Sequence, residues 1–240
     1  MKINRLIVAL LLLLSFTSFS QEVVEKTNAD PFEYFEVYDP FESFNRRVYY
    51  FNYQFDKYIF LPTVRIYKNI TPEPVRKGVK NFFNNTDNIA TTGNSILQFK
   101  IGKAMRAIGR FTMNATLGVG GLFDVASSMG MPKPYEDFGL TLAHYGIGKG
   151  PYLVLPLLGP SSLRDAFGMG VDTLGKGALY DTVDLDDLNH FGATLVHSID
   201  RRSNVPFQYY QTGSPFEYEY MRFLYFKYRK LQAELGSEVF

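Results

Sequence analysis

The 240-residue chain contains no cysteine and no tryptophan. Without cysteine it can form no disulfide framework, no thiolate metal site and no cysteine nucleophile, and it offers no cysteine for lipid attachment. Its 25 Lys and Arg nearly balance its 24 Asp and Glu, so strong electrostatic attraction to nucleic acid is not expected. These absences exclude several classes of function before any motif is considered.

Beyond its first residues the chain also lacks long hydrophobic runs. The longest, Tyr152 to Leu158, is interrupted by Pro156. A helix that crosses the hydrocarbon core of a bilayer needs about 20 apolar residues. A conventional transmembrane helix is therefore excluded, whereas helices that lie in the plane of a membrane are compatible with the sequence.

Residues 1–20 have the pattern of a secretory signal peptide. Lys2 and Arg5 precede an unbroken apolar run from Leu6 to Leu14, and small residues at positions 18 and 20 suit cleavage before Gln21. Cleavage would remove two basic residues and no acidic one from the totals of 25 and 24, giving the mature chain a net charge of −1. We expect an exported protein that starts at Gln21 and carries no acyl chain, as its intact mass would reveal.

After this segment we expect an N-terminal arm at 21–38, a single helical domain at 39–235 and a tail at 236–240. Hydrophobic periodicity predicts the helices of that domain. They are expected at 41–59, 75–99, 101–117, 161–181, 185–202 and 214–235. Pro62 is expected to end the first helix. Glycine and proline are frequent in residues 128–160, which predicts a long structured loop that holds no helix.

Aromatic side chains are concentrated in the first predicted helix. Its apolar residues recur at spacings of three and four, with tyrosines beside this stripe. One interpretation is the core helix of a soluble protein. The other is a helix at a membrane boundary, where rings with polar tips sit at the headgroup level. The residues assigned to this predicted membrane-boundary helix are Phe41, Phe44, Tyr49, Tyr50, Phe51, Tyr53 and Phe55.

Patterns that could support catalysis are weak. Gly170–Gly177 resembles a phosphate-binding loop but lacks the hydroxyl residue that ligates magnesium. The three histidines do not have the spacing of a metal site. Ser161 or Ser162 with His144 and Asp165 could form a hydrolase triad, but the Gly-x-Ser-x-Gly elbow is absent. We expect no catalytic residue, no metal and no cofactor.

Read in order, a series of motifs resembles the MlaA (VacJ) family from about Asp39 to Arg229. The matching segments are Asp39–Arg46, Tyr49–Asn52, Asn94–Gln98, Arg110–Phe111, Asn114–Gly121, Asp124–Ala126, Phe138–Gly139, His144–Gly146, Gly150–Tyr152, Leu155–Pro156, Gly159–Ser161, Arg164–Asp165, Ile199–Arg202, Arg222 and Tyr225. Three positions depart from the family pattern. Ser20–Gln21 stands where many members have a lipidated cysteine, while Ala143 and Ser214 replace an expected glycine and aspartate.

The resemblance implies an all-α fold in which amphipathic helices and the Gly/Pro-rich loop form a ring embedded in the outer membrane, on its periplasmic side. Such a ring would pass phospholipid mislocalised in the outer leaflet through an amphipathic channel, without catalysis. The implied partners are phospholipid, the outer membrane, a trimeric porin and a soluble periplasmic lipid carrier. Two alternatives stay open: the chain could itself be a soluble periplasmic lipid-binding carrier, or a phospholipase.

By its position, the Gly/Pro-rich segment 139–158 is the candidate channel lining or gate. Glycine adopts backbone angles closed to other residues, which predicts a tight turn between two apolar arms. The residues assigned to the channel or gate are Leu140, Leu142, Gly146, Gly148, Gly150, Tyr152, Leu153, Leu155 and Pro156.

Overall fold

In the computed structural model, residues 37–181, 187–211 and 213–235 are described. The predicted signal peptide, nearly all of the arm and the C-terminal tail lie outside them. The described chain is mostly helical, with one two-stranded antiparallel hairpin. The elements are α2 (Glu42–Phe55), the π-helical turn η2 (Asp56–Phe60), α3 (Leu61–Ile70), α4 (Glu73–Leu97), α5 (Ile101–Thr116), α6 (Val125–Ser128), α7 (Phe138–His144), β1 (Tyr152–Leu155), β2 (Gly159–Ser162), α8 (Leu163–Asp181), α9 (Asp187–Ser203) and α10 (Glu217–Leu235).

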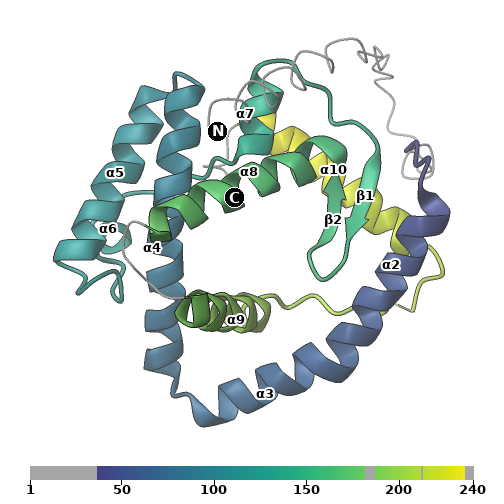
Figure 1. The fold of residues 1–240 in the computed structure, drawn as a ribbon, viewed down its shortest axis with the longest axis horizontal. Coiled ribbons are helices and arrows are strands. Elements are labelled where there is room, and N and C mark those ends of the chain that lie inside the picture. Colours follow the sequence, from purple (N-terminus) through teal and green to yellow (C-terminus); the bar gives the residue numbers. More distant parts are fainter. Residues whose placement is uncertain (1–36, 182–186, 212, 236–240) are drawn as a thin grey trace.

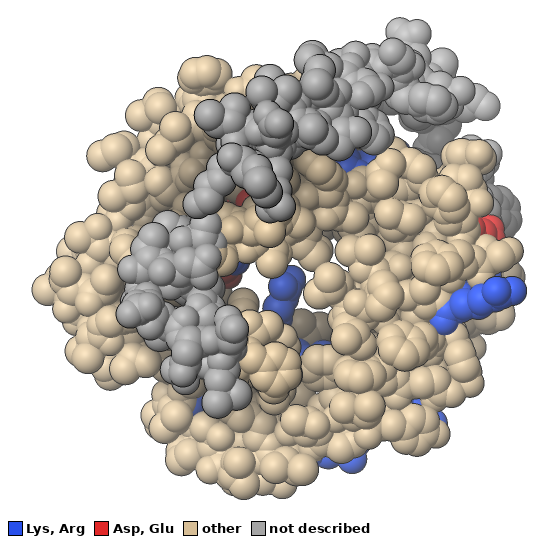
Figure 2. All heavy atoms as spheres, in the orientation of Figure 1, with Lys and Arg blue, Asp and Glu red and all other residues tan. Residues whose placement is uncertain are grey.

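The elements are arranged around a central space. In Figure 1, α2, α3, α4 and α8 surround it, α9 is seen end-on near its lower edge, and the β1–β2 hairpin lies between α2 and the space. Figure 2 shows a hollow at this place, with side-chain atoms of Lys or Arg visible inside it. We call this hollow the central opening.

The first helical segment continues past Pro62, so the predicted helix end there was wrong. The π-helical turn η2 joins α2 to α3, and Pro62 lies in the first turn of α3. Proline lacks a backbone N–H and its ring crowds the preceding turn, which is tolerated where a helix begins or widens. The chain is therefore helical from Glu42 to Ile70 and forms one long side of the molecule.

The segment 128–160 holds a helix and a strand, so the prediction of a loop without a helix was wrong. The predicted helical character of the fold is confirmed, with one small hairpin in addition. The carboxylate of Asp137 accepts a hydrogen bond from the Leu140 N–H at 2.8 Å and caps α7. Gly146 and Gly150 have positive φ angles of 79° and 68°, which leads the chain into β1. The hairpin turn itself lies at 156–158, where Leu157 also has a positive φ.

Two asparagines of α2 hold the open edge of β1. The side-chain amide of Asn45 donates to the Tyr152 carbonyl at 3.0 Å and accepts from the Val154 N–H at 2.9 Å. Two helical turns later, Asn52 donates to the Leu155 carbonyl at 3.0 Å and accepts from the Leu157 N–H at 2.7 Å. These amides replace a neighbouring strand, because each supplies the donor and the acceptor that an edge strand leaves unpaired.

Several helices turn polar side chains inward and apolar ones outward. The buried residues of α4 are Asn85, Asn88, Thr91, Asn94 and Ser95. Its Phe82, Ile96 and Leu97 are exposed. Across the described residues, buried polar side chains outnumber buried hydrophobic ones. This is the reverse of the usual burial preference in a soluble globule.

A small aromatic core joins α2, β1 and α10. Tyr49 and Tyr152 are almost fully buried and pack edge-to-face with Tyr218, and Phe226 packs on Tyr152. Tyr49 donates its hydroxyl to Glu217 at 2.7 Å. The structure thus places Tyr49 inside the protein, which corrects its assignment to the membrane-boundary helix.

We predict that Asn45→Ala and Asn52→Ala each lower the free energy of unfolding by about 1–3 kcal/mol, because each leaves a backbone carbonyl and an N–H of the hairpin unpaired. Urea unfolding followed by circular dichroism measures the loss. Asn69→Ala, at an exposed position near the end of α3, is the matched control. Equal stability of all three variants would contradict the role of the asparagines.

Candidate functional site

The residues assigned to the channel separate into two groups. Leu140, Leu142 and Tyr152 are buried in the packing of α7 and β1. The others are more accessible. Half-buried residues are Leu153 and Leu155, and exposed residues are Gly146, Gly148, Gly150 and Pro156. The strand alternates, so Leu153 and Leu155 lie on the face of β1 opposite Tyr152.

The hairpin has an apolar tip at 156–158, within the segment 139–158 that is expected to line or gate the channel. Leu157 and Leu158 are 51% and 62% exposed. In Figure 1 the tip points along the right side of the central opening, toward the segment that follows α9. That segment comes close to the hairpin, because the Tyr209 hydroxyl lies 3.8 Å from the place where a Cβ on Gly159 would be.

The residues assigned to the membrane-boundary helix, apart from Tyr49, lie toward the surface. Four of them are exposed, namely Phe41, Phe44, Tyr50 and Phe51. Tyr53 and Phe55 are half-buried. The predicted apolar stripe is therefore turned outward, and Val48 is its buried member.

A buried ion-pair cluster joins α7, α8 and α10. Arg229 donates to both carboxylate oxygens of Asp137 at 2.7 and 2.9 Å, and to both of Asp165 at 3.0 and 2.9 Å. Tyr225 donates to Asp165 at 2.6 Å. Gly139 makes room for this cluster, since a Cβ there would lie 2.5 Å from an Asp165 oxygen and 2.8 Å from Arg229. Burial alone would raise the pKa of Asp165, but hydrogen bonds from Arg229 outweigh it and lower the pKa.

A second cluster ties the start of α2 to α10. The Asp39 carboxylate accepts from the Asn45 amide at 2.9 Å, from Tyr218, and from Arg222 at 3.4 Å. The Asp39 side chain is fully buried in this arrangement. The sequence analysis found Asp39 and Asn45 only as part of a motif and did not assign these contacts.

A third cluster lies between α4, α5 and the segment before α7. Glu136 is buried and accepts from the Gln98 amide at 2.9 Å and from the ammonium groups of Lys100 and Lys103 at 3.0 and 2.6 Å. Burial would raise the pKa of Glu136, but hydrogen bonds from the two lysines and Gln98 lower it. Gln98 also donates to Thr141 at 3.0 Å, which connects α7 to the same cluster.

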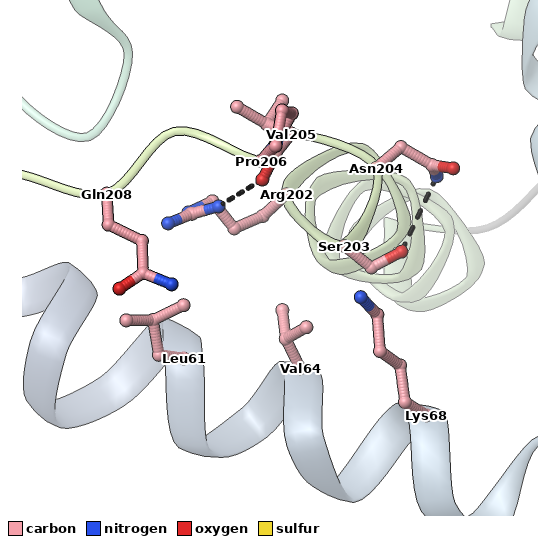
Figure 3. Close-up of a pocket in the computed structure, with 9 residues that line it drawn as sticks. All are labelled: Leu61, Val64, Lys68, Arg202, Ser203, Asn204, Val205, Pro206 and Gln208. Atoms are coloured by element: carbon pink, nitrogen blue, oxygen red, sulfur yellow. Dashed lines mark hydrogen bonds between the residues drawn. The ribbon is translucent and has the colours of Figure 1, made fainter.

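A pocket of about 440 Å³ opens between α3 and the end of α9. Its lining residues, shown in Figure 3, are Leu61, Val64, Lys68, Arg202, Ser203, Asn204, Val205, Pro206 and Gln208. Arg202 anchors one wall, because it donates to both Asp56 carboxylate oxygens at 2.6 and 2.8 Å and to the carbonyls of Val205 and Phe207. The pocket combines an apolar floor with polar groups at its sides.

The patterns considered for catalysis do not form a site in the structure. Ser161 and Ser162 are buried in β2, and the Ser162 hydroxyl accepts from the backbone N–H of Asp165 at 3.2 Å. Asp165 is bound by Arg229, and among the described residues no hydrogen bond joins His144 to either serine. Gly170–Gly177 lies within α8 and forms no phosphate loop.

No helix in the described part of the chain combines the length and the apolar character needed to cross a membrane. In the same residues, no group of three His, Asp or Glu side chains is placed to hold a metal ion.

A family model described as MlaA lipoprotein matches residues 37–232. The chain is 42% identical to the intermembrane phospholipid transport system lipoprotein MlaA of Escherichia coli over 136 residues, covering 54% of this chain and 53% of that protein. It is 31% identical to the protein of that name from Haemophilus influenzae, covering 72% of this chain and 68% of the relative.

It is also 49% identical to an uncharacterized protein of Rickettsia felis, over 54% of this chain and 52% of the relative. In most of these comparisons the chain therefore spans about half the length of the curated relatives it matches. A solved structure from work on the structural basis for maintenance of bacterial outer membrane lipid asymmetry matches 82% of this chain and all of that one, with a TM-score of 0.68 and 32% identity.

We predict that Arg229→Met lowers the free energy of unfolding by about 3–5 kcal/mol at neutral pH, because it removes the cation that Asp137 and Asp165 share and leaves Asp165 with Arg164 alone. In the native protein the pKa of Asp165 is lowered, so its contribution is present above the ordinary carboxyl pKa and is lost as pH falls through the lowered value. Without Arg229 the largest cause of this lowering is lost, so the pKa of Asp165 rises and the variant loses part of this contribution to stability above the ordinary carboxyl pKa. The difference in the free energy of unfolding between the native protein and the variant should become smaller as the pH falls toward about 4.

Urea unfolding at neutral and acidic pH measures the free energy of unfolding of both proteins. Lys230→Met is the control, because Lys230 is the exposed next residue of α10 and lies outside the cluster. A difference that stays constant with pH would contradict the assignment of the effect to the carboxylates.

Proposed function

Because the chain belongs to the MlaA lipoprotein family, we propose that it transports phospholipid across part of the bacterial envelope and thereby maintains outer-membrane lipid asymmetry. In this proposal it lies within the outer membrane as a ring of helices. Phospholipid mislocalised in the outer leaflet enters the central opening and leaves toward the periplasm. The relatives from Escherichia coli and Haemophilus influenzae are lipoproteins of an intermembrane phospholipid transport system.

The observation that carries this proposal is the reversed amphipathicity of the helices. Large apolar side chains are exposed on α2, α4 and α5, including Phe44, Phe82 and Met105. In water, contiguous exposed apolar surface of this kind marks a contact with a membrane or another protein. In a bilayer the same side chains face acyl chains, while the inward asparagines and ion pairs satisfy one another away from lipid.

A central opening with cationic atoms in it supports the transport step. A phospholipid needs a polar path for its phosphate and an apolar surface for its acyl chains. The hairpin supplies apolar surface at the edge of the opening through Leu153, Leu155 and the tip at 156–158. Leu140, Leu142 and Tyr152 then serve as the packed support behind this surface.

The attachment of the protein to the membrane is part of the proposal. The chain holds no cysteine, although it belongs to a lipoprotein family. We propose that the outward apolar faces supply the attachment, with a trimeric porin as neighbour and a soluble periplasmic carrier as acceptor of the lipid.

The two alternative functions fit the structure less well. A soluble carrier would bury its apolar side chains. A phospholipase would require an accessible nucleophile, whereas Ser161 is buried.

We predict that Leu153→Asp and Leu155→Asp leave a folded protein that no longer restores outer-membrane permeability resistance in a deletion strain. A charge beside the lipid path obstructs acyl chains, because an unpaired charge in an apolar site costs several kcal/mol. His144→Ala and Ser161→Ala should retain most of the function, since no nucleophilic chemistry is proposed.

Detergent resistance of the strain and the level of phospholipid in the outer leaflet are the readouts, with circular dichroism as the control for folding. If the alanine variants abolish function while both aspartates are silent, the channel assignment is wrong and a hydrolase has to be considered again.

A further inference from the structure

We propose that the pocket between α3 and the end of α9 binds the phosphate-bearing headgroup of a phospholipid, with Lys68 as its charged contact. This inference rests on the proposed transport function and gives it a defined headgroup site. Four features of the pocket support it. Two of its side chains have donors that form no hydrogen bond within the described residues, its lining contains no carboxylate, its floor is apolar, and it lies near the hairpin tip.

Most polar groups around the pocket are already bound to protein. Arg202 is neutralised by Asp56 through two hydrogen bonds. The Ser203 hydroxyl and the Asn204 amide both donate to the Asp200 carbonyl, at 2.8 and 2.7 Å. These groups shape the wall, and they have little capacity left for a ligand.

Lys68 and Gln208 differ from them. Figure 3 shows the Lys68 ammonium pointing into the pocket toward Ser203, and the Gln208 amide pointing into it from the opposite side. Among the described residues, no carboxylate forms an ion pair with Lys68, and no hydrogen bond is formed by either side chain's nitrogen. Asp56 is paired with Arg202, and Asp200, which accepts from the neutral Tyr67 hydroxyl, is not among the residues that line the pocket. The pocket lining therefore offers an ammonium group that has no ion pair among the described residues, together with a neutral donor.

The remaining lining is apolar. Leu61 and Val64 come from one face of α3, and Val205 and Pro206 close the other side. At about 440 Å³ the pocket lies in the size range of small-molecule sites. It can enclose a phosphodiester headgroup with the adjoining glycerol, and it is too small for two long acyl chains. A phospholipid would therefore leave its chains outside.

The place of the pocket suits a stopping point on the lipid path. The segment 204–208 forms its upper wall in Figure 3, and in Figure 1 the chain after α9 runs between α3 and the hairpin tip. In this arrangement the headgroup of a lipid occupies the pocket while its acyl chains contact the apolar hairpin tip. A phosphate-bearing ligand is favoured over a neutral or cationic one, because the lining cation that has no ion pair among the described residues is an ammonium, which binds phosphate as a point charge.

The test uses the full chain, purified in detergent, and isothermal titration with three probes: a short-chain phosphatidylglycerol, a diacylglycerol with the same chains, and inorganic phosphate. We expect the phosphatidylglycerol to bind the unaltered protein more tightly than the other two. Lys68→Gln should weaken its binding about tenfold, the loss of one charge-assisted hydrogen bond, and Gln208→Leu should weaken it less. Lys68→Arg should retain binding, and so should Lys230→Gln, a lysine change on α10 outside the pocket.

Three results would overturn the inference. If Lys68→Gln binds phosphatidylglycerol as the unaltered protein does, the pocket is not the headgroup site. The transport function is tested separately, by the hairpin variants in cells. If inorganic phosphate binds as tightly as the lipid and depends equally on Lys68, the site takes a free anion. If none of the probes binds, the pocket has no role for a phosphate. Circular dichroism of each variant shows that a lost signal does not come from unfolding.

Discussion

The fold depends on polar side chains that satisfy one another in its interior. Asn45 and Asn52 complete the hydrogen bonds of the hairpin edge, and Arg229 holds two carboxylates from α7 and α8. Because these groups pair inside, the helices can turn their apolar side chains outward. A buried polar group without a partner costs free energy in any solvent, and the cost is greatest where no water is available. Interior pairing is thus the condition for an apolar exterior.

This arrangement also explains how a central opening can persist. A dry apolar core would collapse on an opening to remove surface from water, whereas rigid hydrogen-bonded contacts resist such a collapse. The ion pairs are placed at the joints between elements, with Glu136 joining α4, α5 and α7, and Asp39 joining α2 to α10. The hairpin and the Lys68 pocket are then held at defined positions beside the opening, as a path for an amphipathic cargo requires.

The sequence predicted the helices well because their periodicity is local. The helix expected at 101–117 is confirmed as α5, and the one expected at 75–99 as α4. Periodicity does not tell which face is buried, so the stripe around Phe44 could be read as core or as surface. The helix end at Pro62 was wrong because a widened turn accommodates the proline. The hairpin was missed because its partner strand contains glycine and proline, and its edge is completed by asparagines more than a hundred residues away in sequence.

The site was harder to predict than the fold, because its residues come together from segments that are distant in sequence. Tyr49 and Tyr50 are neighbours in sequence, yet one is buried against Tyr218 and the other is exposed, since adjacent helical residues point in different directions. The Lys68 pocket is built from α3 and from the chain after α9, and no local pattern links the two. The segment 139–158 was assigned by its position, but only the structure separates its buried residues from its accessible ones.

The contact of the outward apolar face with lipid is tested most directly by fluorescence, because the chain contains no tryptophan. Phe44→Trp on α2 and Phe82→Trp on α4 place a single fluorophore on that face, and Phe226→Trp places one in the core. The proteins are reconstituted in bilayers whose acyl chains carry bromine, which quenches tryptophan on contact. If the outward face lies in lipid, the emission of the first two variants is strongly quenched and that of the third is not. Equal and weak quenching of all three would contradict a membrane-embedded ring.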